Sequence, residues 1–188
     1  YLPSLLKEGC CLPDRVVFGD KLVSSSVEYA SDLATGDGSF ENPGRIRISH
    51  TLMKKLMIPE PLVYRVKVKD SCVAIGPVIG FLLGIHTHRY TPKHMEKYSD
   101  RFGIYNKVGG LIYAFSPKSV NWKKRIAYGL YYNIATSSWE YGCFPLPEVI
   151  YRRDFHSNPG FIRRLIEITG GRLFNSYRFS KYELYEYL

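Results

Sequence analysis

Residues 75–84 form an apolar run with the sequence Ile75-Gly76-Pro77-Val78-Ile79-Gly80-Phe81-Leu82-Leu83-Gly84. Because nearly every side chain from Val73 to Leu83 is apolar, this run predicts a strand covered on both faces of a sheet. A second run, Val149 to Tyr151, is followed by Arg152 and Arg153. In open parallel sheets, ligands bind at the carboxyl ends of the strands. The functional residues are therefore expected where these two strands end.

Strand and helix patterns alternate from this run onward. The sequence predicts a helix from Thr91-Pro92 to Gly109-Gly110, a strand at 111–115, a hairpin at 126–133 and 138–144, a helix at 161–169, a strand at 172–175 and a helix from Lys181. Such alternation is typical of an α/β fold with right-handed crossovers. We therefore predict an open, mostly parallel sheet with flanking helices over residues 71–188.

Residues 1–70 have a different pattern. Short runs with β-type composition lie at 15–18, 21–29, 45–48 and 63–69, and a short helix is expected at 52–57. Residues 34–44 are rich in Gly, Asp, Ser, Asn and Pro, which predicts a loop. This part of the chain is therefore expected to form a small antiparallel β-rich module with one short helix.

Composition limits the classes of partner. Hydrophobic residues make up 45% and aromatic residues 15% of the chain, enough for a core. The longest apolar run, Val78 to Ile85, is far short of the roughly 20 residues of a membrane helix, so no membrane span is expected. The net charge of +9 favours anionic partners such as nucleotide phosphates, nucleic acid or an acidic polymer. The basic residues are scattered, which disfavours nucleic acid and leaves a solvated basic surface as the alternative.

The four cysteines predict neither a metal site nor a disulfide framework. They are Cys10, Cys11, Cys72 and Cys143. Adjacent Cys10 and Cys11 lack the spacer of zinc-binding pairs, and the other two are isolated among strand residues. Unpaired thiols are typical of a reduced compartment, so a cytoplasmic protein is expected.

The candidate cleft residues follow the predicted strands. They are His86, Thr87, His88, Ser116, Arg152, Arg153 and Asn175. Two histidines at this spacing could share a metal, but the sequence offers no third ligand, so polar lining of a crevice or an exposed turn is expected instead. An arginine after a strand can bind a carboxylate or phosphate with two parallel hydrogen bonds, or it can be an exposed loop residue.

Common nucleotide-binding motifs are absent from this sequence. Gly76, Gly80 and Gly84 are spaced four and four, whereas the dinucleotide fingerprint needs Gly-x-Gly-x-x-Gly at the start of a helix. Neither a Walker A motif nor a Gly-x-Ser-x-Gly elbow occurs. A classical dinucleotide site and a P-loop enzyme are therefore not expected.

Taken together, the motifs resemble those of the YheC/YheD-like ATP-grasp proteins, which are described as endospore coat-associated. The matching segments are Ile75 to Gly80, Gly110 to Pro117, Phe144 to Tyr151 with Arg153, Phe174-Asn175, and Phe179 to Tyr185. Their order and spacing match that family over about residues 45–188. The chain departs from the family pattern at three positions, where Arg152 replaces Asn or Asp, Ser180 replaces Asp and Tyr182 replaces Trp.

This resemblance implies a pre-ATP-grasp-like, substrate-side domain that is followed by an ATP-grasp module. Enzymes of this kind use ATP and Mg²⁺ to join a carboxylate to an amine or similar nucleophile through an acyl-phosphate. The start of the chain at Tyr1 and the helix pattern that is cut off at Leu188 predict a part of a longer protein. The catalytic carboxylates, magnesium ligands and ATP-binding lysines are expected after Leu188, so no catalytic residue is assigned within this chain.

The same resemblance allows a function without catalysis. A degenerate ATP-grasp scaffold could act as a structural or interaction protein of the spore coat, and the basic, Tyr-rich composition fits binding to acidic polymers or coat proteins. The two hypotheses differ in partner and location. A ligase would act on a small carboxylate in the cytoplasm, whereas a scaffold would bind coat proteins in the spore coat.

Overall fold

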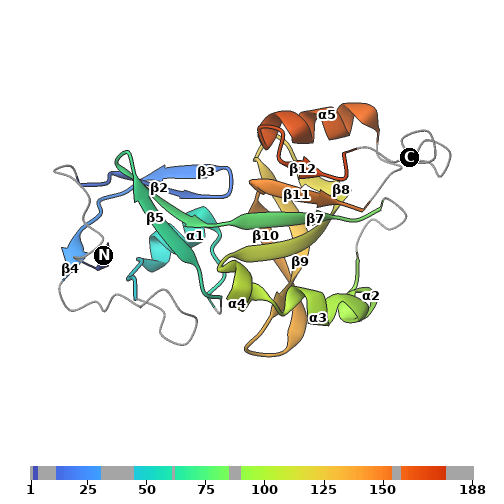
Figure 1. The fold of residues 1–188 in the computed structure, drawn as a ribbon, viewed down its shortest axis with the longest axis horizontal. Coiled ribbons are helices and arrows are strands. Elements are labelled where there is room, and N and C mark those ends of the chain that lie inside the picture. Colours follow the sequence, from blue (N-terminus) through green and yellow to red (C-terminus); the bar gives the residue numbers. More distant parts are fainter. Residues whose placement is uncertain are drawn as a thin grey trace, which may run out of the picture.

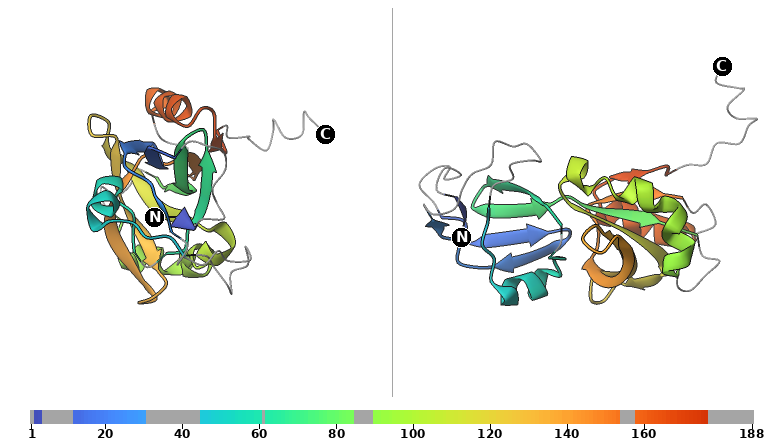
Figure 2. Two further views of the ribbon diagram at one scale, coloured as in Figure 1. Left: turned by 90° about the vertical axis from the view of Figure 1, so that its left-hand side faces the viewer. Right: turned by 90° about the horizontal axis from the view of Figure 1, so that it is seen from below.

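The computed structural model describes residues 2–3, 12–30, 45–60, 62–84, 90–153 and 158–176. It has an α/β fold that is rich in strands and contains few helices. Two main sheets lie side by side along the long axis of the molecule (Figures 1 and 2). A short parallel pair, β1 (Leu2–Pro3) and β4 (Tyr29–Ala30), forms a third sheet.

The first main sheet contains four strands in the order β3-β2-β6-β5. Their bounds are Lys21–Ser24 for β3, Arg15–Phe18 for β2, Cys72–Gly76 for β6 and Arg65–Lys69 for β5. The outer pairs are antiparallel as predicted, but the central strands β2 and β6 are parallel. Residues 45–48 were expected to form a strand and do not.

One helix, α1 (His50–Leu56), accompanies this sheet, as predicted. Ser49 caps it, because the Ser49 hydroxyl accepts a hydrogen bond from the Leu52 amide at 3.2 Å. Met57 ends the helix with a left-handed φ of 61°. The predicted helix at 52–57 therefore exists and begins slightly earlier in the chain.

The second main sheet contains six strands in the order β10-β9-β8-β7-β11-β12. Their bounds are Ser138–Pro145 for β10, Ile126–Asn133 for β9, Leu111–Asn121 for β8, Val78–Leu82 for β7, Val149–Arg152 for β11 and Leu173–Phe174 for β12. Strands β8, β7, β11 and β12 are parallel, whereas the β9–β10 hairpin adds two antiparallel strands. The sheet is therefore mixed, with the predicted parallel strands at one side.

The predicted strand from Val73 to Leu83 is divided between the two sheets. Its first half is β6, its second half is β7, and the break lies at Gly76–Pro77. Gly76 has a φ of 144°, which residues other than glycine rarely adopt. Pro77 has no amide hydrogen to donate to a neighbouring strand. The chain passes from the first main sheet to the second at Gly76–Pro77, whereas the sequence predicted a domain boundary between residues 70 and 71. That division into domains stays a prediction.

The single helix predicted from Thr91 to Gly109 is a series of short segments. They are α2 (Pro92–Met95), a 3₁₀ turn at Glu96–Tyr98, α3 (Ser99–Phe102) and α4 (Tyr105–Val108). The predicted cap is present, since the Thr91 hydroxyl accepts a hydrogen bond from the His94 amide at 3.4 Å. The Phe102 ring fixes the series to the sheet through edge contacts with Phe81 and Trp139, with centroid distances of 5.2 and 4.8 Å.

Helix α5 (Pro159–Ile168) agrees with the prediction for residues 161–169. Asn158 caps its start, because the Asn158 side chain accepts a hydrogen bond from the Gly160 amide at 2.7 Å. Its buried side chains are Ile162 and Leu165. Figure 1 shows α5 and the α2–α4 series on opposite sides of the six-stranded sheet.

Polar contacts join the two main sheets. The Arg125 guanidinium pairs with the Asp20 carboxylate at 2.8 Å, and the Asp20 amide donates to the Leu146 carbonyl at 3.0 Å. The Arg65 amide donates to the Gly109 carbonyl at 2.7 Å. The Asp20 side chain is only 8% exposed, and its burial raises the pKa of the carboxyl above its usual value although Arg125 lowers it.

The close packing of Gly110 against the backbone of Pro77 can be tested by substitution. A Cβ atom added to Gly110 would lie 2.1 Å from the Pro77 carbonyl oxygen and 2.7 Å from its nitrogen. Because both atoms belong to the backbone, Gly110→Ala should lower the free energy of unfolding by about 1–3 kcal/mol in urea denaturation. Gly103→Ala is the control, since its nearest atom is 3.3 Å away, and it should change stability by less than about 1 kcal/mol. Equal effects of the two substitutions would contradict this packing.

Titration of Asp20 provides a second test. Its raised pKa means that the folded protein takes up this proton at a higher pH than the unfolded chain does. Wild type should therefore gain free energy of unfolding relative to Asp20→Asn as the pH falls from about 7 to about 4. Urea denaturation of both proteins at several pH values measures this difference. A difference that stays constant or shrinks on acidification would show that the carboxyl is not buried in this way.

Candidate functional site

The strand order of the six-stranded sheet reverses between the neighbouring strands β7 and β11. The connection after β7 passes through α2–α4 to β8 on one side, and the connection after β11 passes through α5 to β12 on the other side (Figure 1). In open α/β sheets, ligands bind outside the carboxyl ends of the strands at such a switch point. The carboxyl ends of β7 and β11 are therefore the centre of the candidate site.

Backbone hydrogen bonds align the ends of the parallel strands. The Leu83 amide donates to the Phe115 carbonyl, and the Arg153 amide donates to the Leu82 carbonyl, both at 2.9 Å. The Asn175 side-chain amide donates to the Arg152 carbonyl at 3.4 Å. The structure thus brings Ser116, Arg153 and Asn175, residues that the sequence singled out, to one edge of the sheet.

The two adjacent arginines lie on opposite faces of the sheet. Arg152 is 8% exposed, and its guanidinium donates to the Ser176 carbonyl at 2.8 Å, which ties β11 to the segment after β12. Arg153 is exposed, and its guanidinium carbon lies 5.7 Å from the centre of the Tyr98 ring. Arg153 therefore presents a cation at the switch point, whereas Arg152 serves the fold.

The remaining predicted residues have different positions. Asn175 is exposed and has a left-handed φ of 56°, which fits a turn residue. Ser116 is only 2% exposed, and its hydroxyl lacks a hydrogen-bond partner among the described residues. His86, Thr87 and His88 lie outside the residues that the structure describes, so their role stays a prediction.

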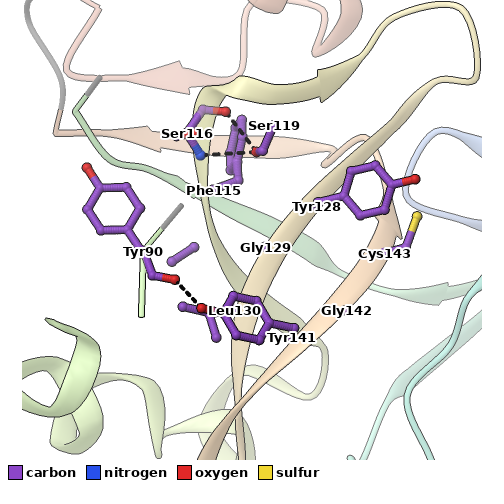
Figure 3. A pocket seen from close by; sticks show the side chains of 11 residues that line it. Tyr90, Phe115, Ser116, Ser119, Tyr128, Gly129, Leu130, Tyr141, Gly142 and Cys143 are labelled. Carbon is purple, nitrogen blue, oxygen red and sulfur yellow. Dashed lines mark hydrogen bonds between the residues drawn. The ribbon is translucent and has the colours of Figure 1, made fainter. Parts of the chain in front are cut away.

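A hollow of about 580 Å³ lies next to Ser116 on the sheet face that Ala114 and Leu130 share (Figure 3). We call it the tyrosine pocket. Its lining residues are Tyr90, Ala114, Phe115, Ser116, Ser119, Tyr128, Gly129, Leu130, Tyr141, Gly142 and Cys143. The α2–α4 series contacts Phe81 and Trp139 on this face and leaves the part above β8–β10 open.

The pocket tyrosines were not among the residues singled out from the sequence, and Tyr128 and Tyr141 lie within the predicted hairpin. Tyr128 pairs with Cys143 and Leu130 pairs with Tyr141, so these four side chains do alternate onto one face as expected of a hairpin. Tyr128 and Tyr141 nevertheless remain 53% and 44% exposed. No pattern within a single segment shows this grouping, because the pocket tyrosines come from separate segments and meet only through the sheet.

Two hydrogen bonds hold one wall of the tyrosine pocket. The Tyr141 hydroxyl donates to the Tyr90 carbonyl at 2.6 Å, and the Tyr90 hydroxyl donates to the Gly84 carbonyl. Gly84 follows β7 and Tyr90 precedes α2, so these bonds fix both ends of the connecting segment against β10. The pocket is therefore adjacent to the switch point.

Neither a metal centre nor a membrane segment is found in the part of the chain that the structure describes. Within these residues, no three His, Cys, Asp or Glu side chains gather in a way that would hold a metal ion. None of the helices in the described ranges combines the length and the apolar character that crossing a membrane requires.

Comparisons of the chain with protein-family models, with curated proteins and with solved structures find no match.

The anchoring of Tyr90 gives a direct test of the pocket wall. Tyr90→Phe removes only the hydroxyl that holds Gly84, and it should lower the free energy of unfolding by about 0.5–1.5 kcal/mol. Tyr151→Phe is the matched control, because Tyr151 stacks on Phe81 and the structure shows no bond from its hydroxyl to a described residue. Urea denaturation compares the two. A loss in the control as large as that in Tyr90→Phe would contradict the anchoring.

Proposed function

We propose that this chain is the substrate-side part of an ATP-dependent carboxylate ligase of the ATP-grasp type. The observation that carries the proposal is the position of Arg153 at the carboxyl ends of β7 and β11, where the crossovers separate to opposite faces. The motif resemblance gives the reaction class, and the switch point gives the place where a substrate would bind.

Arg153 has the properties needed to bind the substrate carboxylate. Its backbone is held by the hydrogen bond to Leu82, so the side chain projects from a rigid strand end. The ring of Tyr98 supports the guanidinium from one side, and the exposed side chain can still reach a ligand. A guanidinium binds a carboxylate through two parallel hydrogen bonds and stabilises the negative charge that an acyl-phosphate adds.

In this proposal, ATP and Mg²⁺ are held by a module that follows Leu188. The motif resemblance implies this module, because the catalytic carboxylates, magnesium ligands and ATP-binding lysines of such enzymes lie in it. Bound ATP would supply the phosphoryl group that activates the carboxylate. The role of the present chain is to bind and orient the carboxylate against that module.

The proposal is tested with a protein that continues beyond Leu188. Calorimetry should detect ATP binding in the presence of Mg²⁺ for the longer protein and not for residues 1–188 alone. A screen of carboxylates and amines should then identify a pair that releases ADP. If neither protein binds ATP, the ligase proposal fails, and a coat scaffold becomes the better explanation of the motifs.

The role of Arg153 is tested with the same ADP-release measurement. Loss of a charged hydrogen bond costs about 1.5–3 kcal/mol, so Arg153→Ala should raise KM for the carboxylate by roughly 10- to 150-fold. Arg153→Lys should recover part of that loss because it keeps the charge without the planar pair of donors. Arg101→Ala, an exposed arginine on α3, is the control and should leave KM unchanged. A KM for Arg153→Ala equal to that of the control would rule out this role.

A further inference from the structure

We infer that the tyrosine pocket is a binding site for a small aromatic carboxylate. The site does not depend on the ligase proposal, because Arg153 is not among its lining residues. Its volume of about 580 Å³ falls within the range of roughly 300–1,000 Å³ that is usual for small-molecule sites. The chemistry of its walls, its polar end and its surrounding charge each restrict the ligand.

The walls favour a flat ring. Figure 3 shows Tyr90 and Tyr128 on opposite sides of the hollow, with Tyr141 at the end away from the serines. Ala114 and Leu130, both buried, supply an apolar floor between them. Aromatic side chains bind flat rings through stacked and edge contacts and add to the burial of apolar surface.

The wall formed by Tyr90 and Tyr141 is also fixed before a ligand arrives. Tyr141 and Tyr90 are joined by the hydroxyl–carbonyl hydrogen bond at 2.6 Å, and Tyr90 is anchored on Gly84. Tyr128 stands on β9, a strand with neighbours on both sides in the sheet. A pocket with rigid aromatic walls loses little conformational entropy when it binds a ligand.

Ser116 supplies a polar group that the fold itself does not use. Its hydroxyl is buried and lacks a partner among the described residues, which is a costly arrangement in the absence of a ligand. The neighbouring Ser119 hydroxyl is occupied, because it accepts from the Ser116 amide at 3.2 Å and donates to the Ser116 carbonyl at 2.9 Å. These bonds close a bulge in β8, and Ser116 lines one end of the pocket. In this inference its unpartnered hydroxyl turns toward the ligand and binds a carboxylate oxygen.

The charge around the pocket distinguishes an aromatic acid from a quaternary ammonium ion, which is the main alternative ligand. Three tyrosines around a hollow can also bind a quaternary ammonium ion through cation–π contacts. None of the described lining residues is acidic, and the charges of Lys21 and Lys124 act on Cys143 at the edge of the pocket. The net charge of +9 acts in the same direction. A cation is therefore disfavoured, and an anion is favoured.

The experiment uses residues 1–188 without ATP and three probes of known chemistry. These are 2-naphthoate, cyclohexanecarboxylate as an acid without an aromatic ring, and choline as a quaternary ammonium ion. Titrations are followed by NMR through the methyl groups of Ala114 and Leu130. We expect 2-naphthoate to shift both methyl groups and to bind at least about tenfold more tightly than either of the other probes.

Two variants with matched controls locate the ligand. Ser116→Ala should weaken 2-naphthoate binding by about two- to tenfold and, because it removes an unpaired buried hydroxyl, should raise Tm by about 2–4 °C. Tyr128→Leu should weaken binding by roughly tenfold. Ser24→Ala and Tyr151→Leu, which lie outside the pocket, should leave the affinity unchanged.

Several results would overturn the inference. Tighter binding of choline would assign the pocket to cations, and equal binding of the two acids would remove the role of the aromatic walls. Binding of 2-naphthoate that leaves the Ala114 and Leu130 methyl groups unshifted, or that Tyr128→Leu leaves intact, would place the ligand elsewhere. None of these results depends on the ATP measurements, so this inference and the ligase proposal can fail separately.

Discussion

The passage of the chain through Gly76–Pro77 is the constraint on which the rest of the structure depends. Here one apolar run leaves the four-stranded sheet as β6 and enters the six-stranded sheet as β7. The Pro77 carbonyl accepts a hydrogen bond from the Leu111 amide at 2.9 Å, and the backbone of Gly110 packs directly against Pro77. This close contact fixes the start of β7 against the start of β8 and so sets the register of the parallel strands.

The register in turn places the candidate site. Because β7 begins beside β8, the pairing of the two strands ends at Leu82 and Phe115, although β8 itself continues to Asn121 instead of ending at residue 115 as predicted. Strand β11 joins β7 on the other side, with Arg152 opposite Leu82. The β7–β8 and β11–β12 connections run in opposite directions along the sheet, which defines the switch point, and right-handed crossovers then place the α2–α4 series and α5 on opposite faces. Since α2–α4 is short and broken, it covers only part of its face, and the tyrosine pocket remains above β8–β10.

Much of this arrangement follows from patterns within single segments. The β9–β10 hairpin, β11 and α5 lie close to their predicted ranges, because alternation and helix caps are local signals. The split of residues 73–83 between two sheets was not predicted, since a buried strand in either sheet has the same apolar composition. The fragmentation of the helix after Thr91 depends on contacts of Phe102 with distant strands.

The candidate site residues also divide into those that local patterns predict and those that only the tertiary structure brings together. The alignment of Ser116, Arg153 and Asn175 follows from the rule that parallel strands share their carboxyl edge. Which of the two arginines faces outward depends on the pleat of β11, and the sequence placed both in the cleft. The pocket tyrosines are separated along the chain from Tyr90 to Tyr141 and meet only through the sheet. Their grouping is therefore a property of the tertiary structure.

The central claim is that the carboxyl ends of β7 and β11 bind an activated carboxylate. The most direct test is an NMR titration of residues 1–188 with acetyl phosphate, the simplest acyl-phosphate, followed through backbone amides. We predict that the amides of Leu83 and Arg153 shift and that those of Val78 and Val149, at the opposite ends of the same strands, do not. Equal shifts at both ends, or shifts at neither, would contradict the account.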